Sequence, residues 1–154
     1  VNCLKSFAAP ALEFSISFDK TEYKKGDSIN VEYKIENISK SPFYVNKRFF
    51  VNSEKSNGKE REIYFNITSP SKEKLVFKQE LETGLPKSDY FVLLNADEEI
   101  ASERPRNVKY YFEFDVTGQY EIVGVYQNSC GEEIGLDVYK EKVVSEKLFI
   151  IVTE

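Results

Sequence analysis

The clearest structural signal in this chain is the run Asp115-Val-Thr-Gly118-Gln-Tyr120-Glu-Ile122-Val-Gly-Val-Tyr126. A glycine-containing turn leads directly into a segment that alternates between apolar and polar residues, which predicts a strand with Tyr120 and Ile122 facing inward. A tyrosine at the start of such a strand can turn its hydroxyl back onto the backbone just upstream, an arrangement called a tyrosine corner. We therefore predict a tyrosine corner at Tyr120, with Tyr120 and Ile122 in the core opposite Val31 and Tyr33.

Length and composition indicate one domain. The chain has 154 residues, and a domain of this size can bury roughly 68–70% of the surface that its unfolded chain exposes. Aromatic residues make up 14% of the chain, all of them Tyr or Phe, and these side chains favour strands. The net charge is −5, with both signs interleaved, whereas a nucleic-acid-binding surface needs a coherent basic face. We therefore predict an N-terminal arm over residues 1–10, a single domain over residues 11–154 and no nucleic-acid partner.

Two segments, residues 11–18 and 28–36, alternate strictly between apolar and polar residues. A period of two places the apolar residues on one face of a strand, which a helix cannot do. Each segment therefore predicts a strand with one face in the core and the other in water. The predicted inward residues are Leu12, Phe14, Ile16, Phe18, Ile29, Val31, Tyr33 and Ile35.

Further apolar segments separated by turn residues predict more strands. Residues 90–94 are apolar on both faces, which favours a central strand or one covered by a loop. With about eight or nine strands at short spacing, the pattern predicts an all-β, antiparallel sandwich or barrel. Residues 95–101 and 132–139 could each contain a single helical turn. The other predicted strands are residues 43–51, 63–67, 75–77, 110–114, 120–127 and 147–152.

The N-terminal residues suggest a location. The sequence contains no Met, which indicates a processed or trimmed chain. No apolar run approaches the ~18 residues that cross a bilayer, so membrane attachment is expected only through lipid. Val1-Asn-Cys3 resembles the end of a bacterial lipobox, in which the cysteine carries the lipid, and the alternative is a thiol on a loose arm. We predict an extracytoplasmic protein, in the periplasm, on the cell surface or secreted, with Cys3 as the candidate lipid anchor.

The two cysteines, Cys3 and Cys130, allow one intramolecular disulfide. Closing this loop would stabilise the fold by roughly 4–5 kcal/mol in the chain-entropy model. The bridge would pin the N-terminal arm to a late loop and would require an oxidising compartment. Two free thiols are the alternative, and the cysteine pattern does not choose between them.

Catalysis is not predicted. The sequence has no His, which excludes Ser-His-Asp and Cys-His centres and His-based metal sites within this chain. The carboxylate runs at 97–99 and 132–133 are typical of solvated turns. Asp97, Glu98 and Asp137 lack the spacing of a calcium-binding loop. We therefore predict neither an enzyme nor a bound cofactor or metal ion.

Adjacent aromatic residues suggest a binding surface. In a strand, Phe49 and Phe50 would point to opposite sides, so that one ring faces outward beside Arg48, and Tyr111 has a similar neighbour in Tyr110. An exposed aromatic side chain beside a cation is a frequent hot spot of protein binding. The alternative is that the loop of residues 52–60 covers the outward ring. The candidate surface comprises Arg48, Phe49, Phe50 and Tyr111.

Several turns resemble those of bacterial immunoglobulin-like domains. Phe18-Asp-Lys-Thr-Glu-Tyr-Lys-Lys-Gly26-Asp27, followed by Val31-Glu-Tyr-Lys-Ile-Glu-Asn37, is similar to an opening in which YxxGD leads into a strand ending at Asn. Leu94-Asn-Ala-Asp-Glu-Glu-Ile100 is similar to an LxPGExI turn, with Ala-Asp in place of Pro-Gly. Thr117-Gly-Gln-Tyr120 resembles a PGxY corner, and Val144-Ser-Glu-Lys-Leu-Phe-Ile150 resembles the closing strand.

The resemblance implies an immunoglobulin-like sandwich with Greek-key topology, of the kind found in uncharacterised exported proteins and lipoproteins. A more distant resemblance connects it to sandwiches of the intracellular proteinase inhibitor type. We therefore expect a non-catalytic binding or interaction module whose partner is another protein or a cell-surface component. A proteinaceous protease inhibitor is the alternative, and a structural component of a cell-envelope assembly is the third expectation.

Overall fold

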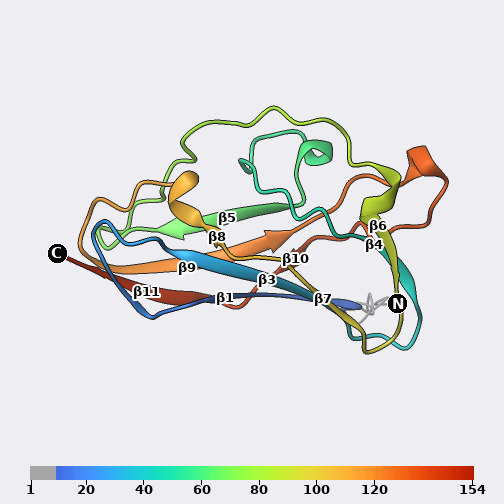
Figure 1. Ribbon diagram of the computed structural model, residues 1–154, viewed down its shortest axis with the longest axis horizontal. Coiled ribbons are helices and arrows are strands. Elements are labelled where there is room, and N and C mark those ends of the chain that lie inside the picture. The colour runs from blue at the N-terminus through green and yellow to red at the C-terminus, as the bar shows by residue number, and fades with distance from the viewer. Residues whose placement is uncertain (1–9) are drawn as a thin grey trace, which may run out of the picture.

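The computed structural model describes residues 10–154, and the fold is all-β. This part of the chain contains eleven strands and four short 3₁₀ helices. The strands form a four-stranded and a five-stranded sheet, with a two-stranded sheet at one end of the molecule (Figure 1). The prediction of an all-β fold is therefore confirmed, with two more strands than the upper count expected, because several strands have only two or three residues.

The first sheet is built around the most regular alternating segments of the sequence. Strand β1 (Leu12–Phe18) pairs antiparallel with β3 (Asn30–Asn37) along its whole length. The far side of β3 pairs with β7 (Glu99–Ala101) and with β8 (Arg106–Asn107). Every second residue of β1 and β3 is buried, as the period of two predicts, although Phe18 at the end of β1 is only half-buried.

The second sheet is centred on β9 (Gly118–Tyr126), which contains the run singled out in the sequence. β9 pairs antiparallel with β5 (Ile63–Thr68) on one side, and with β11 (Leu148–Thr153) and β10 (Val143–Val144). β2 (Glu22–Lys24) pairs parallel with β11 at the edge of the sheet. Five residues of β9 are buried, because β9 is a central strand with partner strands on both of its edges.

The third sheet pairs β4 (Phe43–Asn46) with β6 (Phe91–Leu94). Of the two alternatives predicted for residues 90–94, the central strand is wrong, because β6 has one strand partner and Leu93 is 46% exposed. The alternative of a strand covered by a loop agrees with Phe91, which is buried in a cluster with Cys130 and Val138.

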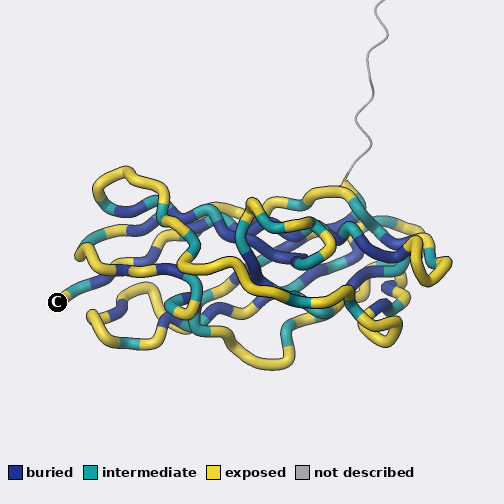
Figure 2. Tube along the Cα trace, turned by 90° about the horizontal axis from the view of Figure 1, so that it is seen from above, coloured by how far each residue is buried: buried dark blue, intermediate teal, exposed yellow. Residues whose placement is uncertain are grey.

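One core joins the two larger sheets, with buried segments running through the middle of the molecule and exposed segments at its rims (Figure 2). Gly124 of β9 allows the close approach of β1, since an added Cβ would lie 3.0 Å from Cε1 of Phe14 and 3.1 Å from Cγ2 of Ile16. The sheets therefore pack face to face as two layers. Buried contributors include Leu12, Val31, Tyr33, Ile35, Ile63, Phe65, Ile67, Tyr120, Ile122, Tyr126, Ile150 and Val152.

Tyr120 is fully buried at the start of β9, and its hydroxyl returns to the backbone. The hydroxyl donates to the carbonyl oxygen of Val116, 2.6 Å away, and accepts from the amide of the same residue at 3.1 Å. Gly118 has a φ of 129°, and a Cβ there would lie 2.8 Å from Cβ of Pro70. The turn therefore requires glycine, and the hydroxyl of Tyr120 ties it to the strand in the geometry of a tyrosine corner.

The side-chain amide of Asn37, at the end of β3, is buried between the first and third sheets. Its Nδ2 donates to the carbonyl oxygens of Ser41 and Leu94, both at 2.9 Å. Its Oδ1 accepts from the amide and hydroxyl of Ser39. Asn37 is thus the polar connection between β3 and the end of β6, which gives a physical reason for an asparagine at this position.

The strands expected at residues 110–114 and 75–77 are absent from the described chain, and the strand expected at 43–51 ends at Asn46. Val108–Tyr110 forms a 3₁₀ helix, because the side chain of Asn107 accepts a hydrogen bond from the amide of Lys109. Phe49 has a φ of 52°, which no strand contains. Aromatic residues in these segments serve as core contacts at bends, so their strand propensity is overridden by packing.

A long connection of residues 69–90 links β5 to β6 and arches along the molecule (Figure 1). It contains the 3₁₀ helix Ser88–Tyr90 and no strand. The helical turn expected within residues 132–139 is present as Glu132–Ile134, whereas residues 95–101 form a turn and β7. Among residues 10–154, no helix is long and apolar enough to span a membrane.

Candidate functional site

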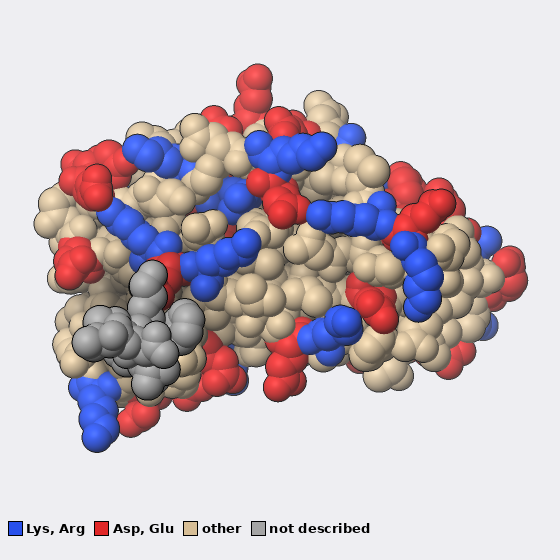
Figure 3. Space-filling model, turned by 180° about the vertical axis from the view of Figure 1, so that it is seen from behind, with Lys and Arg blue, Asp and Glu red and all other residues tan. Residues whose placement is uncertain are grey.

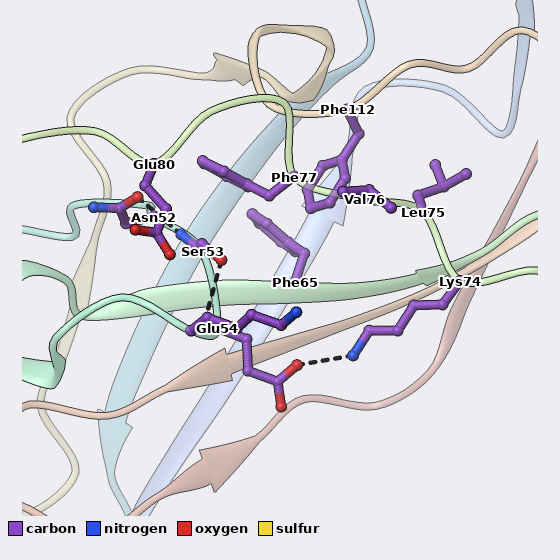
Figure 4. Close-up of a pocket in the computed structure, with 11 residues that line it drawn as sticks. Asn52, Ser53, Glu54, Phe65, Lys74, Leu75, Val76, Phe77, Glu80 and Phe112 are labelled. Atoms are coloured by element: carbon purple, nitrogen blue, oxygen red, sulfur yellow. Dashed lines mark hydrogen bonds and ion pairs between the residues drawn. The ribbon is translucent and has the colours of Figure 1, made fainter.

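An aromatic groove lies beneath the long connection, at the outer edge of β5 (Figure 4). Its volume is about 350 Å³. Four separate parts of the chain form it: the loop after Val51, strand β5, the segment of residues 74–80, and Phe112. The apolar lining residues are Phe65, Leu75, Val76, Phe77 and Phe112, and the polar ones are Asn52, Ser53, Glu54, Lys55, Lys74 and Glu80.

Three phenylalanines form the floor of the aromatic groove. Phe65 comes from β5 and Phe112 from the bend after the 3₁₀ helix, and both are buried. Phe77 packs edge-to-face on Phe112, with ring centroids 5.5 Å apart, and stacks on Tyr111 at 5.6 Å. Such pairs contribute about 0.5–1.5 kcal/mol beyond area burial, so the floor is a rigid apolar surface.

The rim of the aromatic groove carries charges of both signs. Nζ of Lys74 lies 2.8 Å from Oε2 of Glu54, so this ion pair joins two loops across the groove (Figure 4). The hydrogen bond from Lys74 lowers the pKa of Glu54 against the opposing effect of desolvation. Both side chains are about half-exposed, and exposed pairs of this kind contribute about 0–1 kcal/mol. The pair is therefore weak enough to be displaced by a ligand.

The outer edge of β5 has unpaired peptide groups at Phe65, a residue that is 4% exposed. In an antiparallel pair, hydrogen-bonded and non-hydrogen-bonded positions alternate. The bond from the amide of Gln127 to the carbonyl of Glu62 sets this alternation, so the amide and carbonyl of Phe65 point away from β9. The neighbouring groups that point the same way are paired. The amide of Ile63 donates to the carbonyl of Phe50, and its carbonyl accepts from the amide of Asn52. The carbonyl of Ile67 accepts from the amide of Leu75. The peptide groups of Phe65 have no such partner within residues 10–154.

The segment that closes the aromatic groove holds one apolar side chain out to solvent. Val76 is 82% exposed, between the partly buried Leu75 and Phe77. The amide of Leu75 donates to Ile67 at 2.8 Å, and the amide of Lys78 donates to Tyr111, also at 2.8 Å. Both sides of Val76 are thus anchored to the fold.

Arg48 is not an exposed hot-spot cation, contrary to expectation. Its side chain is 9% exposed and forms a bidentate ion pair with Glu62, which is 1% exposed. Its Nη1 also donates to the carbonyl oxygen of Gly84 at 2.7 Å. The guanidinium lies 5.5 Å from the ring centroid of Phe50, which is half-buried. Arg48 therefore connects the loop of Phe50 to the long connection.

Phe49 and Tyr111 also face other parts of the protein. Phe49 packs on the core, with ring centroids 6.3 Å from Tyr33 and 6.2 Å from Tyr126. Tyr111 is half-buried under Phe77, while its neighbour Tyr110 is 79% exposed. The four candidate residues consequently do not form one exposed patch. Their expected places on strands were wrong, because positive φ at Phe49 and the 3₁₀ helix before Tyr111 change the side-chain directions.

Cys130 has no disulfide partner within residues 10–154 and is 3% exposed, in a small cluster with Phe91 and Val138. Burial raises the pKa of this thiol. Cys3 lies outside the described residues, so the disulfide from Cys3 to Cys130 and the lipid anchor at Cys3 stay predictions. The thiol of Cys130 is enclosed by protein, and a bridge to it would have to enter that cluster.

The acidic runs are occupied by local contacts. Glu132 pairs with Lys140 at 2.9 Å, and Glu133 pairs with Lys59 at 3.0 Å. Glu98 accepts from the backbone amide and side chain of Asn95, which lowers the pKa of Glu98. Within residues 10–154, no group of three or more acidic or thiol side chains is arranged to hold a metal ion.

Sequence reasoning did not find the aromatic groove. Apart from Phe65 in β5, its residues come from segments with no regular period, and their convergence depends on the path of the long connection. The run of apolar residues at 75–77 predicts a short strand and gives no sign of a groove. No family model matches this chain, and the search of curated proteins likewise gave no match.

Proposed function

We propose that this protein is a non-catalytic binding module that holds an extended peptide segment of a partner protein in the aromatic groove. The observation that carries the proposal is the unpaired peptide groups of Phe65 on the outer edge of β5, directly beside an apolar cavity. An extended peptide can add to a sheet edge through its main chain, while a pocket selects one of its side chains. The aromatic groove offers both of these contacts at one position.

The rim indicates what kind of peptide fits. Glu54 and Glu80 are balanced by Lys55 and Lys74, so the rim selects neither strongly acidic nor strongly basic segments. The cavity of about 350 Å³ with its phenylalanine floor suits one aliphatic or aromatic side chain. The proposed ligand is therefore a short extended segment with one large apolar residue, whose backbone pairs with Phe65.

Sheet order supports the expectation of an immunoglobulin-like domain. The neighbours β1, β3 and β7 in one sheet, and β5, β9, β11 and the parallel edge strand β2 in the other, are compatible with such a sandwich. The hydrogen bonds of Tyr120 add a second supporting feature. Domains of this architecture host many functions, so the proposed role rests on the groove and not on the fold.

Peptide selection tests the proposed function. A displayed library of random peptides would be selected on the native chain, and the recovered sequences then measured by titration calorimetry. We expect a common apolar residue in an extended context, and loss of binding when the amide nitrogen next to it is methylated, because the bond to the carbonyl of Phe65 is lost. Recovery of peptides that bind equally well after methylation at every position would contradict main-chain pairing.

A groove-filling variant supplies the matched control. Ser53→Trp places a large ring at the rim, whereas Ser71→Trp places the same ring in the neighbouring turn, outside the lining residues. Both variants should keep the melting temperature within a few degrees, since Ser53 is only half-buried and Ser71 is exposed. Peptide affinity should fall at least tenfold in Ser53→Trp and stay unchanged in Ser71→Trp.

Protease inhibition is the second candidate function, and Val76 favours it. An inhibitor must present an exposed side chain on a segment that stays rigid in the protease cleft. Val76 meets this requirement because the backbone is anchored at Leu75 and Lys78 and the side chain is 82% exposed. A small aliphatic side chain would suit a protease with a small apolar specificity pocket.

Inhibition assays separate the two functions. Inhibition of an elastase-type serine protease by micromolar protein, abolished by Val76→Asp and retained in Val116→Asp, would favour the inhibitor. Val116 is a suitable control because it is also exposed and lies on a different turn. Absence of inhibition together with peptide binding sensitive to Ser53→Trp would leave the binding module as the function. An extracytoplasmic location stays part of the proposal and depends on Cys3, outside the described residues.

A further inference from the structure

A second groove, separate from the aromatic groove, contains a concentration of positive charge. It has a volume of about 460 Å³ and lies between the end of β4 and the segment that joins β7 to β8. Its cationic side chains include Lys47, Arg104 and Arg106, all exposed and none in an ion pair within residues 10–154. The rest of the surface mixes both signs, as one face illustrates (Figure 3). We call this site the cationic groove.

The walls of the cationic groove are held by backbone bonds. The amide of Lys47 donates to Tyr90 at 2.8 Å, and the amide of Ser102 donates to the carbonyl of Tyr33, also at 2.8 Å. The hydroxyl of Ser102 accepts from the amide of Tyr33 at 3.0 Å, which leaves its own hydrogen available to a ligand. Arg106 is fixed on β8 opposite Val31. The backbones of Lys47, Ser102 and Arg106 are thus anchored to the fold, while Arg104 lies on the loop between Ser102 and Arg106.

The ring of Tyr33 lies beneath the cationic groove. Tyr33 is 1% exposed, and its hydroxyl is buried with no hydrogen-bond partner within the described chain. Burial raises the pKa of Tyr33, the phenol of Tyr111 adds to that rise, and the charge of Arg106 opposes it. The buried hydroxyl is closed to a ligand in the groove, so recognition there depends on the exposed cations.

Backbone strain accompanies the hydroxyl. Phe49, which lines the cationic groove against the ring of Tyr33, has a φ of 52°. Positive φ is costly for a bulky aromatic residue, and such strain concentrates at binding sites. Arg48 does not contribute to recognition, because Glu62 neutralises it. The carboxylates of Asp89 and Glu103 also line the groove. With three unpaired cations and two carboxylates, the groove has an excess of one positive charge.

We propose that the cationic groove binds a small oxyanion of the phosphate type through Arg104, Arg106 and Lys47. Guanidinium groups recognise phosphate through charge-assisted, bidentate bonds. Free phosphate and a phosphate ester on a larger molecule share this chemistry. The excess of one positive charge at the groove favours an anion over a neutral or cationic ligand.

Titration with inorganic phosphate tests the proposal. The measurement is an NMR spectrum of the backbone amides and the arginine Nε–H groups. It is recorded at constant ionic strength while chloride is replaced by phosphate. We expect saturable shifts at Ser102, Arg104 and Arg106, and an affinity about tenfold weaker in Arg106→Gln, in line with charge-assisted bonds. Lys40→Gln, which removes an exposed charge outside the groove, should bind like the native chain. Non-saturable shifts, or equal weakening in Lys40→Gln, would overturn the proposal. A phenyl phosphate titration distinguishes an ester from the free ion by its affinity.

Discussion

The guanidinium of Arg48 and the carboxylate of Glu62 form a buried, bidentate ion pair. Nε of Arg48 lies 2.8 Å from Oε1 of Glu62, and Nη2 lies 2.7 Å from Oε2. The amide of Phe50 also donates to Oε1, at 3.2 Å. This pair holds the irregular chain after β4 against β5, and it leaves little of Arg48 for a partner protein.

Removing one member of this pair should destabilise the protein strongly. Glu62→Gln leaves the Arg48 charge buried without its counter-charge, and the expected loss is about 3–5 kcal/mol of unfolding free energy. Replacing both residues, as Arg48→Met with Glu62→Leu, should recover most of the loss, because no uncompensated charge remains. Urea unfolding of Arg48→Met, of Glu62→Leu and of the double variant measures this coupling. Additive effects of the two single substitutions on the unfolding free energy would contradict the coupling.

The corner at Tyr120 should contribute a measurable amount to stability. Tyr120→Phe removes the bonds to both backbone groups of Val116 and keeps the ring in the core, so we expect a loss of about 1 kcal/mol. Thermal and urea unfolding of this variant provide the measurement. Tyr110→Phe, at a phenol 79% exposed, should change stability by less than about 0.5 kcal/mol. Equal melting temperatures for Tyr120→Phe and the native chain would count against the corner.

The turn between β6 and β7 should accept proline. The amide of Glu98 donates to the carbonyl of Asn95 at 3.1 Å, and Asp97 has a φ of 65°, as at the third residue of a type II turn. Proline suits the second position, and the amide of Ala96 has no hydrogen-bond partner within residues 10–154. Ala96→Pro should therefore raise the unfolding free energy by about 0.4–1 kcal/mol. A decrease, measured by urea unfolding, would show that the turn has a different geometry.

Acid should weaken the fold through Glu133. Hydrogen bonds from the backbone amides of Gly131 and Glu133, with a further bond from Lys59, lower the pKa of Glu133 from 4.5 to about 2. A carboxyl group with a depressed pKa in the folded state stabilises the protein above its unfolded pKa, and this contribution is lost as the pH falls from 4.5 to about 2. The slope of unfolding free energy against pH in this window should be smaller in Glu133→Gln. Glu82→Gln, at an exposed residue of the long connection, should keep the native slope.

Local pattern was sufficient for the regular strands. The alternation over β1 and β3 predicted which face of each strand is buried, because only one side of a sheet can contact the core. The strand predicted at residues 110–114 does not form, and the reason is also local. Asn107 accepts from the amide of Lys109 and starts a 3₁₀ helix, so strand-forming aromatic residues end on a bend. Side-chain capping overrides propensity at such positions.

Neither groove could be predicted from the sequence. The sequence around Phe65 and around Phe112 does not indicate a binding site. Only the arch of residues 69–90 brings Phe77 next to them. Likewise, Lys47 and Arg106 are isolated cations in the sequence that share one groove in the fold. Their proximity depends on contacts between distant segments, about which a single sequence contains little information.

The run from Asp115 to Tyr126 contained enough information to place a glycine turn, a buried tyrosine and a central strand, since these depend on backbone conformation and a period of two over a few residues. The tertiary structure alone decided that Arg48 is neutralised by Glu62, that the peptide groups of Phe65 are left open, and that the hydroxyl of Tyr33 is buried without a partner. The physical reason is that burial and pairing are properties of a residue's surroundings, which are assembled from several segments, whereas strand alternation is a property of the segment itself.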